Sequence, residues 1–334
     1  MAHKGIVAVS GSNLVPEGVL SYVRSRGYET RHVPHDHFSP TELDHLLDGA
    51  RGYLIGGYES ANEENFERAT ELEVAAFVGT DYQANVGGWK RAHSLGIAVV
   101  HAAGANADSV AELTVSLILA MSRSLCSSPL TPQSVETEQP PAGTELHGKR
   151  LGILGLGRIG GRVARAASLG LGMDVVYHAP ERNISAELQL GVGYCPREEL
   201  FRTSDVISLH RPGPLPGETP DVGRRELELV RTSCVLINAA HPGLVDLDAL
   251  LWAAREKSVR CAFDGVAVGH AWKPLLHLGT DRFLALPAMG YHTSEANLRA
   301  SRWAAEALCD VLDGGSHRLV SNPNFRTVRR AVRG

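Results

Sequence analysis

The 334-residue chain lacks the features of a membrane protein, a nucleic-acid-binding protein or a secreted protein. No apolar run reaches the roughly 18 residues of a spanning helix, and no long apolar segment follows the N-terminus as in a signal peptide. Lys and Arg number 33 against 37 Asp and Glu, so no basic excess attracts nucleic acid or an anionic membrane. We therefore expect a cytoplasmic protein with no nucleic-acid or membrane partner.

Cysteine and histidine are also sparse in arrangements that would bind a metal. The five cysteines include no Cys-x-x-Cys pair, which favours reduced, buried thiols over disulfides. Histidines gather once, in His32-Val-Pro-His35-Asp-His37. An extended chain points alternate side chains in opposite directions, and no Cys or Glu set accompanies them. We interpret this segment as a surface turn and expect no metal site.

A glycine-rich turn is the most informative segment that is present. Gly155-Leu-Gly157-Arg-Ile-Gly160 follows the apolar run 151–154 and opens a helical pattern over 159–169. In a strand–turn–helix context, the first glycine permits the tight turn, the second lets the backbone approach a pyrophosphate, and the third lets helix and strand pack closely. The turn predicts dinucleotide binding through Gly155, Gly157, Arg158, Ile159 and Gly160.

Strand-like and helix-like segments alternate along both halves of the chain. This alternation predicts an α/β fold with two Rossmann-like, doubly wound parallel sheets. The second sheet is expected to have six strands. The expected strands are 6–10, 28–33, 52–56, 74–78 and 97–101 in the first half, and 151–154, 175–177, 206–209, 234–238, 260–263 and 283–286 in the second.

Three longer segments connect these halves. Residues 108–123 are apolar almost all round, which predicts a buried helix at a domain or subunit boundary. Residues 127–144 are rich in Pro, Ser and Thr and are expected to form an exposed loop. Residues 295–312 are expected to form a long final helix that returns to the first domain, followed by an Arg-rich tail.

Several motifs in order make the chain resemble the D-isomer-specific 2-hydroxyacid dehydrogenases. Besides the glycine turn, these motifs are Val78-Gly-Thr-Asp-Tyr82, Gly104-Ala-Asn-Ala-Asp-Ser-Val-Ala-Glu112, Asp205-Val-Ile-Ser-Leu-His210 followed by Pro212, and Asn238-Ala-Ala-His-Pro-Gly-Leu-Val-Asp246.

The resemblance implies an organisation and a reaction. It implies a flavodoxin-like substrate domain of residues 1–103 plus 294–334, with a dinucleotide-binding Rossmann domain, residues 104–293, inserted into it. It also implies an NAD(P) cofactor, a small-molecule substrate in the cleft, and hydride transfer between nicotinamide and a substrate carbon. The region 106–123 commonly contributes to a homodimer interface in that family.

The positions that carry catalysis in the family are altered here. His241 replaces the Arg that binds the substrate carboxylate, and Ala288 replaces the His that transfers a proton. Gly269 falls roughly where the family has the Glu that orients this His. His241, His270 and His292 could rebuild a site, because an imidazole can move a proton or bind an anion. Alternatively, these histidines are solvated loop residues.

The resemblance assigns further contacts. His210, Pro212, Ala240 and Asp264 are expected to contact the cofactor, with Asp264 near the nicotinamide amide or, alternatively, acting only as a strand-end cap. Tyr58, Glu59 and Asn106 are expected at the substrate; alternatively, Tyr58 and Glu59 belong to an ordinary turn.

The choice between NAD and NADP stays open. His178 or Ala179 stands where an NAD enzyme usually has the Asp or Glu that binds the ribose. Arg182 or Arg211 could pair with the 2′-phosphate of NADP, or Glu181 could reach the ribose of NAD.

Three hypotheses follow. The first is an NAD(P)-dependent oxidoreductase with a histidine-based site and an atypical substrate. The second is a catalytically silent dinucleotide-binding sensor or scaffold. The third is an enzyme that uses the same cleft for non-redox chemistry.

Overall fold

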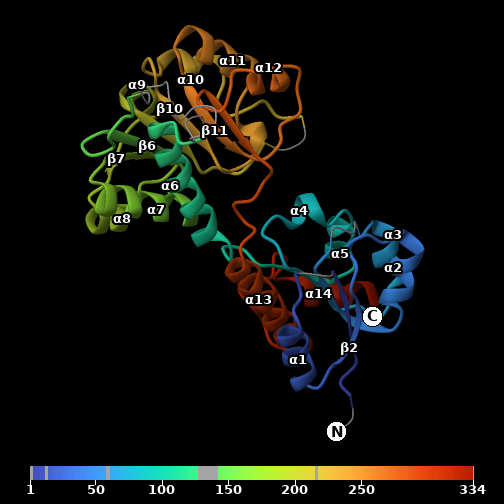
Figure 1. Cartoon of the computed structure of the whole chain (residues 1–334). Coiled ribbons are helices and arrows are strands. Elements are labelled where there is room, and N and C mark those ends of the chain that lie inside the picture. Colours follow the sequence, from blue (N-terminus) through green and yellow to red (C-terminus); the bar gives the residue numbers. More distant parts are fainter. Residues whose placement is uncertain (1–2, 12–13, 58–60, 127–141, 215–216, 334) are drawn as a thin grey trace, which may run out of the picture. The chain divides into compact units, whose positions relative to one another are not determined.

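The computed structural model describes residues 3–11, 14–57, 61–126, 142–214 and 217–333. The chain forms two compact units, each built on a fully parallel sheet (Figure 1). Unit 1 comprises residues 1–106 and 293–334, and unit 2 comprises residues 107–292. The predicted α/β class, with one unit inserted into the other, is confirmed.

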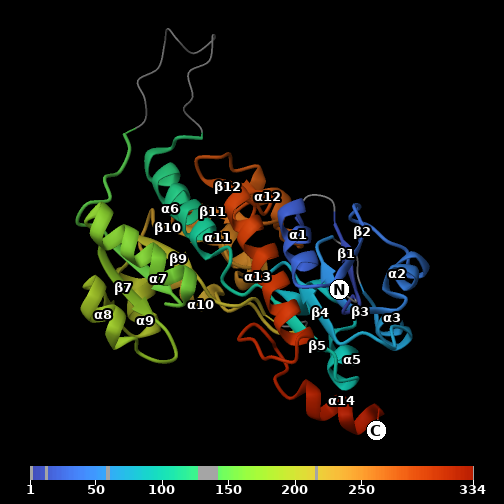
Figure 2. The same ribbon diagram turned by 90° about the horizontal axis from the view of Figure 1, so that it is seen from below.

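Unit 1 contains a five-stranded sheet with the order β2-β1-β3-β4-β5, which is the flavodoxin-like order. Helices α1 and α13 pack on one face, while α2, α3 and α5 cover the other, so the apolar strands are buried on both sides (Figure 2). The elements are β1 (Ile6–Ser10), α1 (Glu17–Ser25), β2 (Glu29–Val33), α2 (Pro40–Leu47), β3 (Ala50–Ile55), α3 (Glu63–Arg68), β4 (Val74–Phe77), α4 (Tyr82–Asn85), α5 (Trp89–Ser94), β5 (Ala98–His101), α13 (Ser294–Leu312) and α14 (Phe325–Arg333).

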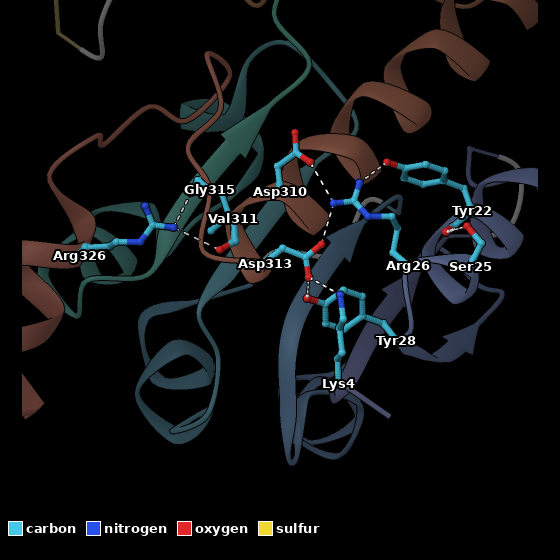
Figure 3. Close-up of polar contacts among 10 residues, drawn as sticks. All are labelled: Lys4, Tyr22, Ser25, Arg26, Tyr28, Asp310, Val311, Asp313, Gly315 and Arg326. Carbon is cyan, nitrogen blue, oxygen red and sulfur yellow. Dashed lines mark hydrogen bonds and ion pairs between the residues drawn. The ribbon is translucent and has the colours of Figure 1, made fainter. Parts of the chain in front are cut away.

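A charged cluster ties the N-terminal part of unit 1 to the end of α13 (Figure 3). The Asp313 carboxylate accepts hydrogen bonds from Lys4 at 2.8 Å, Tyr28 at 2.8 Å and Arg26 at 2.7 Å. Partial burial alone would raise the pKa of Asp313, but these three donors outweigh burial and lower the pKa to about 2. The cluster joins residues that lie about three hundred positions apart in the chain.

Unit 2 contains a seven-stranded sheet with the order β12-β11-β10-β9-β6-β7-β8. Helices α6 and α7 pack on one face, and α9, α10, α11 and α12 pack on the other. The elements are α6 (Ala107–Arg123), β6 (Arg150–Leu154), α7 (Arg158–Arg165) with a π-helical extension (Ala166–Gly170), β7 (Asp174–His178), α8 (Ile184–Leu190), β8 (Gly193–Tyr194), α9 (Arg197–Thr203), β9 (Val206–Leu209), α10 (Arg224–Leu229), β10 (Val235–Asn238), a 3₁₀ turn (Pro242–Leu244), α11 (Leu247–Glu256), β11 (Arg260–Asp264), α12 (Trp272–Leu276) and β12 (Phe283–Leu286).

One expectation about the elements was wrong. The second sheet has seven strands rather than six, because β8 is two residues long and carries no readable alternation. The tail after α13 forms the helix α14, since Phe325 anchors its first turn in the core of unit 1. On α6, Glu112, Ser116 and Leu119 form an exposed stripe in the single chain, so burial of this helix at a subunit boundary stays a prediction. Most of the expected exposed loop, residues 127–141, lies outside the described residues.

Candidate functional site

The carboxyl ends of the strands of unit 2 form one edge, and the expected site residues follow these ends. The parallel register pairs Leu154 with His178 on one side and with Leu209 on the other, and pairs Leu209 with Asn238. The strand order reverses between β6 and β9, and in open α/β sheets ligands bind outside the carboxyl ends at such a reversal. The loops after β6, β9, β10 and β11 therefore meet at one edge.

The glycine turn lies at this reversal, and its three glycines have different surroundings. Gly155 has φ +100°, and a Cβ there would lie 2.5 Å from the His210 carbonyl oxygen. A Cβ on Gly160 would lie 2.2 Å from the Gly155 carbonyl oxygen. Around Gly157, by contrast, no heavy atom of the described residues lies within 4 Å of an added Cβ. The first and third glycines serve the packing of the turn, and the second borders open space.

This open space suits a diphosphate. Gly157 is the N-cap of α7 in an extended conformation, and no described side chain caps the helix there. The first helical residues, Arg158 and Ile159, therefore direct backbone N–H groups toward the space beside Gly157, where the helix dipole favours negative charge. These residues fit the pyrophosphate of a dinucleotide.

The end of β7 holds the residues expected to choose between NAD and NADP. The His178 ring Nδ1 lies 3.1 Å from the Cys195 carbonyl oxygen. Arg182 forms an ion pair with Glu187 at 2.6 Å, and the Tyr177 hydroxyl donates to the same carboxylate at 2.7 Å. These contacts hold the pKa of Glu187 below its usual value, the Arg182 hydrogen bond being the larger cause. Arg182 already has an anionic partner in this structure.

Arg211 is paired as well, and its neighbours in the β9 loop differ in exposure. The Arg211 Nε lies 3.0 Å from an Asp221 carboxylate oxygen. His210 contacts the Ser208 hydroxyl through Nε2 at 2.9 Å, while its buried Nδ1 has no hydrogen-bond partner among the described residues. Burial lowers the pKa of His210 to about 4, so the ring is neutral. Pro212 is exposed.

Asp264 ends β11 and holds the turn that follows β12. Its two carboxylate oxygens accept hydrogen bonds from the backbone N–H groups of Met289 and Gly290, each at 2.8 Å. A Cβ on Gly290 would lie 2.7 Å from one of these oxygens. Ala288, at the start of this turn, has φ +57°, which is uncommon for a residue other than glycine. Asp264 thus fixes the backbone at the altered position 288.

His241 lies in the loop after β10, and its ring is oriented by the backbone. Its Nδ1 accepts a hydrogen bond from the Gly243 N–H at 3.0 Å. The buried Asn238 side chain braces the same loop by accepting from the Ala240 N–H at 3.2 Å and donating to the His241 carbonyl at 3.1 Å. Gly213 packs so closely on the imidazole that a Cβ there would lie 2.5 Å from its Cγ.

The structure brings two of the three expected catalytic histidines to one cavity. His241 and His270 both line a cavity of about 490 Å³ beside the 3₁₀ turn. The His270 Nε2 lies 2.9 Å from an Asp248 carboxylate oxygen, and the His270 side chain is 85% exposed. His292 is exposed and does not line this cavity; its backbone N–H donates to the Met289 carbonyl at 3.0 Å.

The expected substrate residues are less informative. Tyr58 and Glu59 lie outside the described residues. Asn106 is half-buried at the last position of unit 1 before α6. Val266 and Val268 also line this cavity and were not expected at the site. Their position just after β11, at the carboxyl end of a buried parallel strand, is the signal that could have indicated them.

The described residues contain neither a cluster of metal-binding side chains nor a membrane-spanning helix. There, no group of three or more His, Cys, Asp or Glu side chains is arranged to hold a metal ion. No helix of the described chain is both long enough and apolar enough to cross a membrane.

Comparisons with known proteins show the family of the chain. Residues 115–287 match the family model described as "D-isomer specific 2-hydroxyacid dehydrogenase, NAD binding domain". The chain is 35% identical to a glyoxylate reductase of Aeropyrum pernix over 230 residues, which are 66% of this chain and 68% of that enzyme. It is 34% identical to a D-3-phosphoglycerate dehydrogenase of Methanocaldococcus jannaschii over 291 residues, covering 85% of this chain and 54% of that enzyme.

Solved structures give the same result. The crystal structure of the TT0316 protein of Thermus thermophilus superimposes with a TM-score of 0.76 at 27% identity, covering 94% of this chain and 99% of that one. The family match, the two parallel sheets and the glycine turn identify an NAD-binding domain in unit 2, with NAD and NADP both open as the cofactor. The chain belongs to the family of D-isomer-specific 2-hydroxyacid dehydrogenases.

Proposed function

We propose that this protein is an NAD(P)-dependent oxidoreductase that uses histidines where its family uses an Arg–Glu–His set. The observation that carries the proposal is the pairing of an open dinucleotide cradle at Gly157 with an imidazole at His241 and a methyl group at Ala288. The cofactor class is kept, while the two positions that bind and protonate a 2-keto acid in the family are changed. We infer an atypical small-molecule substrate.

The contacts of each residue suggest its role in the reaction. When bound, nicotinamide would supply or accept a hydride at the substrate carbon. The N-terminus of α7 would hold the pyrophosphate, and Asp264 would hold the Met289–Gly290 turn in place. One of His241 and His292 would donate a hydrogen bond to the substrate oxygen, and the other would give that oxygen a proton as the hydride reaches the carbon and would recover it from solvent. In the oxidation direction the same ring would accept the proton.

Other expected roles belong to the same proposal. Asn106 would contact the substrate, and the chain would form a homodimer as its family commonly does. His210, Pro212 and Ala240 would border the cofactor from the β9 and β10 loops.

Turnover is tested with a screen of carbonyl compounds and alcohols, followed by the nicotinamide absorbance. Glyoxylate and 3-phosphoglycerate, named in the relatives, serve as reference carboxylates. Replacing a residue that transfers the proton is expected to lower kcat by about 100-fold or more. We therefore expect such a loss in His241→Ala or His292→Ala, and none in His277→Ala, an exposed histidine at the end of α12. Full activity in both of the first two variants would refute the assignment.

The cofactor choice is tested separately with Glu187→Gln. This change releases Arg182 from its ion pair at the end of β7. If the 2′-phosphate of NADP binds there, the affinity for NADPH should rise relative to NADH by up to about fivefold, the scale of an exposed ion pair. An unchanged ratio in fluorescence titrations would place the ribose away from Arg182.

One observation favours a second candidate, a dinucleotide-binding protein without turnover. Ala288 offers no titratable group at the family's proton-transfer position, and His292 does not share the cavity of His241. This alternative predicts normal NADH or NADPH binding with no substrate in the screen. Restoring the family residues as His241→Arg, Gly269→Glu and Ala288→His should then create glyoxylate reduction, since His tolerates the left-handed backbone of position 288 better than most residues.

A further inference from the structure

The cavity shared by His241 and His270 has the size of a small-molecule site. Its volume of about 490 Å³ lies within the range of roughly 300–1,000 Å³ that ligand pockets occupy. It belongs entirely to unit 2, where the loops after β10 and β11 face each other. The described lining residues are Pro220, His241 to Gly243, Val245 to Asp248, and Val266 to Ala271.

The charges in this cavity do not suit an anion. No Lys or Arg occurs among its described lining residues. Asp246 caps α11 by accepting from the Asp248 and Ala249 N–H groups at 2.9 and 3.0 Å. Asp248 is paired with His270. A carboxylate entering here would meet two carboxylates and no permanent cation, so Coulomb repulsion disfavours it.

Among the polar lining residues, His241 has one ring nitrogen, Nδ1, that is already used by the backbone. Because Nδ1 accepts the Gly243 N–H, the neutral ring carries its proton on Nε2. Nε2 is then a neutral hydrogen-bond donor. Such a donor matches a carbonyl or hydroxyl oxygen and lacks the charged, bidentate fork with which Arg binds a carboxylate.

The remaining wall is aliphatic. Val245, Leu247 and Ala267 line the interior, while Val266 and Val268 are 67% and 101% exposed at the rim. Gly269 adds no side chain, and a Cβ there would lie 3.1 Å from the Leu247 Cδ1, so the aliphatic wall closes on this position. Apolar surface left exposed beside a polar donor is typical of a ligand site.

We infer that this cavity selects an uncharged aliphatic carbonyl compound or the corresponding alcohol, with the His241 Nε2–H donating to its oxygen. The inference rests on the proposed function and adds the substrate class to it. It predicts that a neutral ligand binds better than a carboxylate of the same shape, which reverses the preference expected of an Arg at position 241.

The test uses isovaleramide and isovalerate, which share one aliphatic skeleton and differ in charge. Their affinities are measured calorimetrically on the full chain saturated with NADH or NADPH. The amide should bind at least about tenfold more tightly than the carboxylate. His241→Ala should lower amide affinity about tenfold, the scale of one neutral hydrogen bond, and His241→Arg should reverse the preference. The control His277→Arg should leave both affinities unchanged.

Two further measurements separate the possible failures. Val266→Asp, at an exposed rim position, should lower affinity for both probes and leave cofactor binding intact. Nitrogen-15 spectra should show the neutral ring of His241 with its proton on Nε2 and none on Nδ1, because Nδ1 accepts the Gly243 N–H. Equal or tighter binding of isovalerate, binding of neither probe, or a protonated Nδ1 would overturn the inference. Absence of NADH and NADPH binding would instead overturn the proposed function.

Discussion

Replacing Gly157 by alanine should separate folding from cofactor binding. The backbone at position 157 is extended, with φ −87° and ψ −155°, and an added Cβ meets no described heavy atom within 4 Å. Alanine is a poorer N-cap than glycine by roughly 0.5–1 kcal/mol, and its lower entropy in the unfolded chain stabilises by roughly 0.4–1 kcal/mol. The two effects nearly cancel, so the free energy of unfolding should change by less than about 1 kcal/mol.

The affinity for the dinucleotide should fall much further. The added methyl group occupies the space through which a pyrophosphate approaches the backbone at the start of α7. Losing one hydrogen bond to a charged group costs about 1.5–3 kcal/mol, which is roughly a 10- to 150-fold rise in Kd. Urea denaturation measures the first quantity, and fluorescence titration with NADH and NADPH measures the second.

The neighbouring glycines supply the controls. Gly161→Ala lies within α7, also meets no described atom, and should stabilise the helix by up to about 1 kcal/mol with unchanged cofactor affinity. Gly155→Ala and Gly160→Ala would collide with backbone oxygens at 2.5 and 2.2 Å and should destabilise the fold itself. A folded Gly157→Ala variant with wild-type affinity would refute the reasoning, as would an equal loss in Gly161→Ala.

Further predictions concern titrating groups. The pKa of Asp313 is lowered to about 2 in the folded state, so Asp313→Asn should lower the free energy of unfolding by on the order of 1–2 kcal/mol above about pH 4. This difference should vanish as the pH falls toward about 2. A pH-independent difference in urea denaturation would contradict the prediction. The pKa of His210, about 4, lies below that of an unfolded histidine, so NMR should show this ring neutral at about pH 5.5 and above. The free energy of unfolding should decline as the pH falls from about 6.5 to about 4. An NMR titration midpoint near about 6.5 for His210 would refute its burial. Burial raises the pKa of the Cys234 and Cys261 thiols, so alkylation of the native protein should label exposed Cys126 and spare both until denaturant is added.

Local patterns predicted the fold well. The apolar runs predicted most of the strands, and the spacing of glycines 155, 157 and 160 predicted the strand–turn–helix unit that the structure contains. These features involve residues within about ten positions of each other, so period and spacing are sufficient. The two-residue β8 and the helix α14 were missed, because a short edge strand and a helix anchored by Phe325 depend on distant neighbours rather than on their own pattern.

The candidate site was only partly predictable. The replacements at positions 241 and 288 are visible in the sequence. The ion pair of Arg182 with Glu187 and the hydrogen bonds of Asp264 to the turn after β12 are not. Likewise, no spacing rule shows that the His241 Nδ1 accepts the Gly243 N–H. Side-chain rotation and loop contacts decide which atoms of a histidine face a ligand.

The order of residues by itself determined that this chain folds into two parallel α/β sheets and carries a dinucleotide turn, because alternation and glycine spacing are properties of short segments. Only the tertiary structure decided that Gly157 borders open space while Gly160 abuts Gly155, and that two histidine-bearing loops enclose an aliphatic cavity without a permanent cation. Those facts arise where the parallel register brings distant loops to one edge, and no local pattern specifies which of their atoms meet.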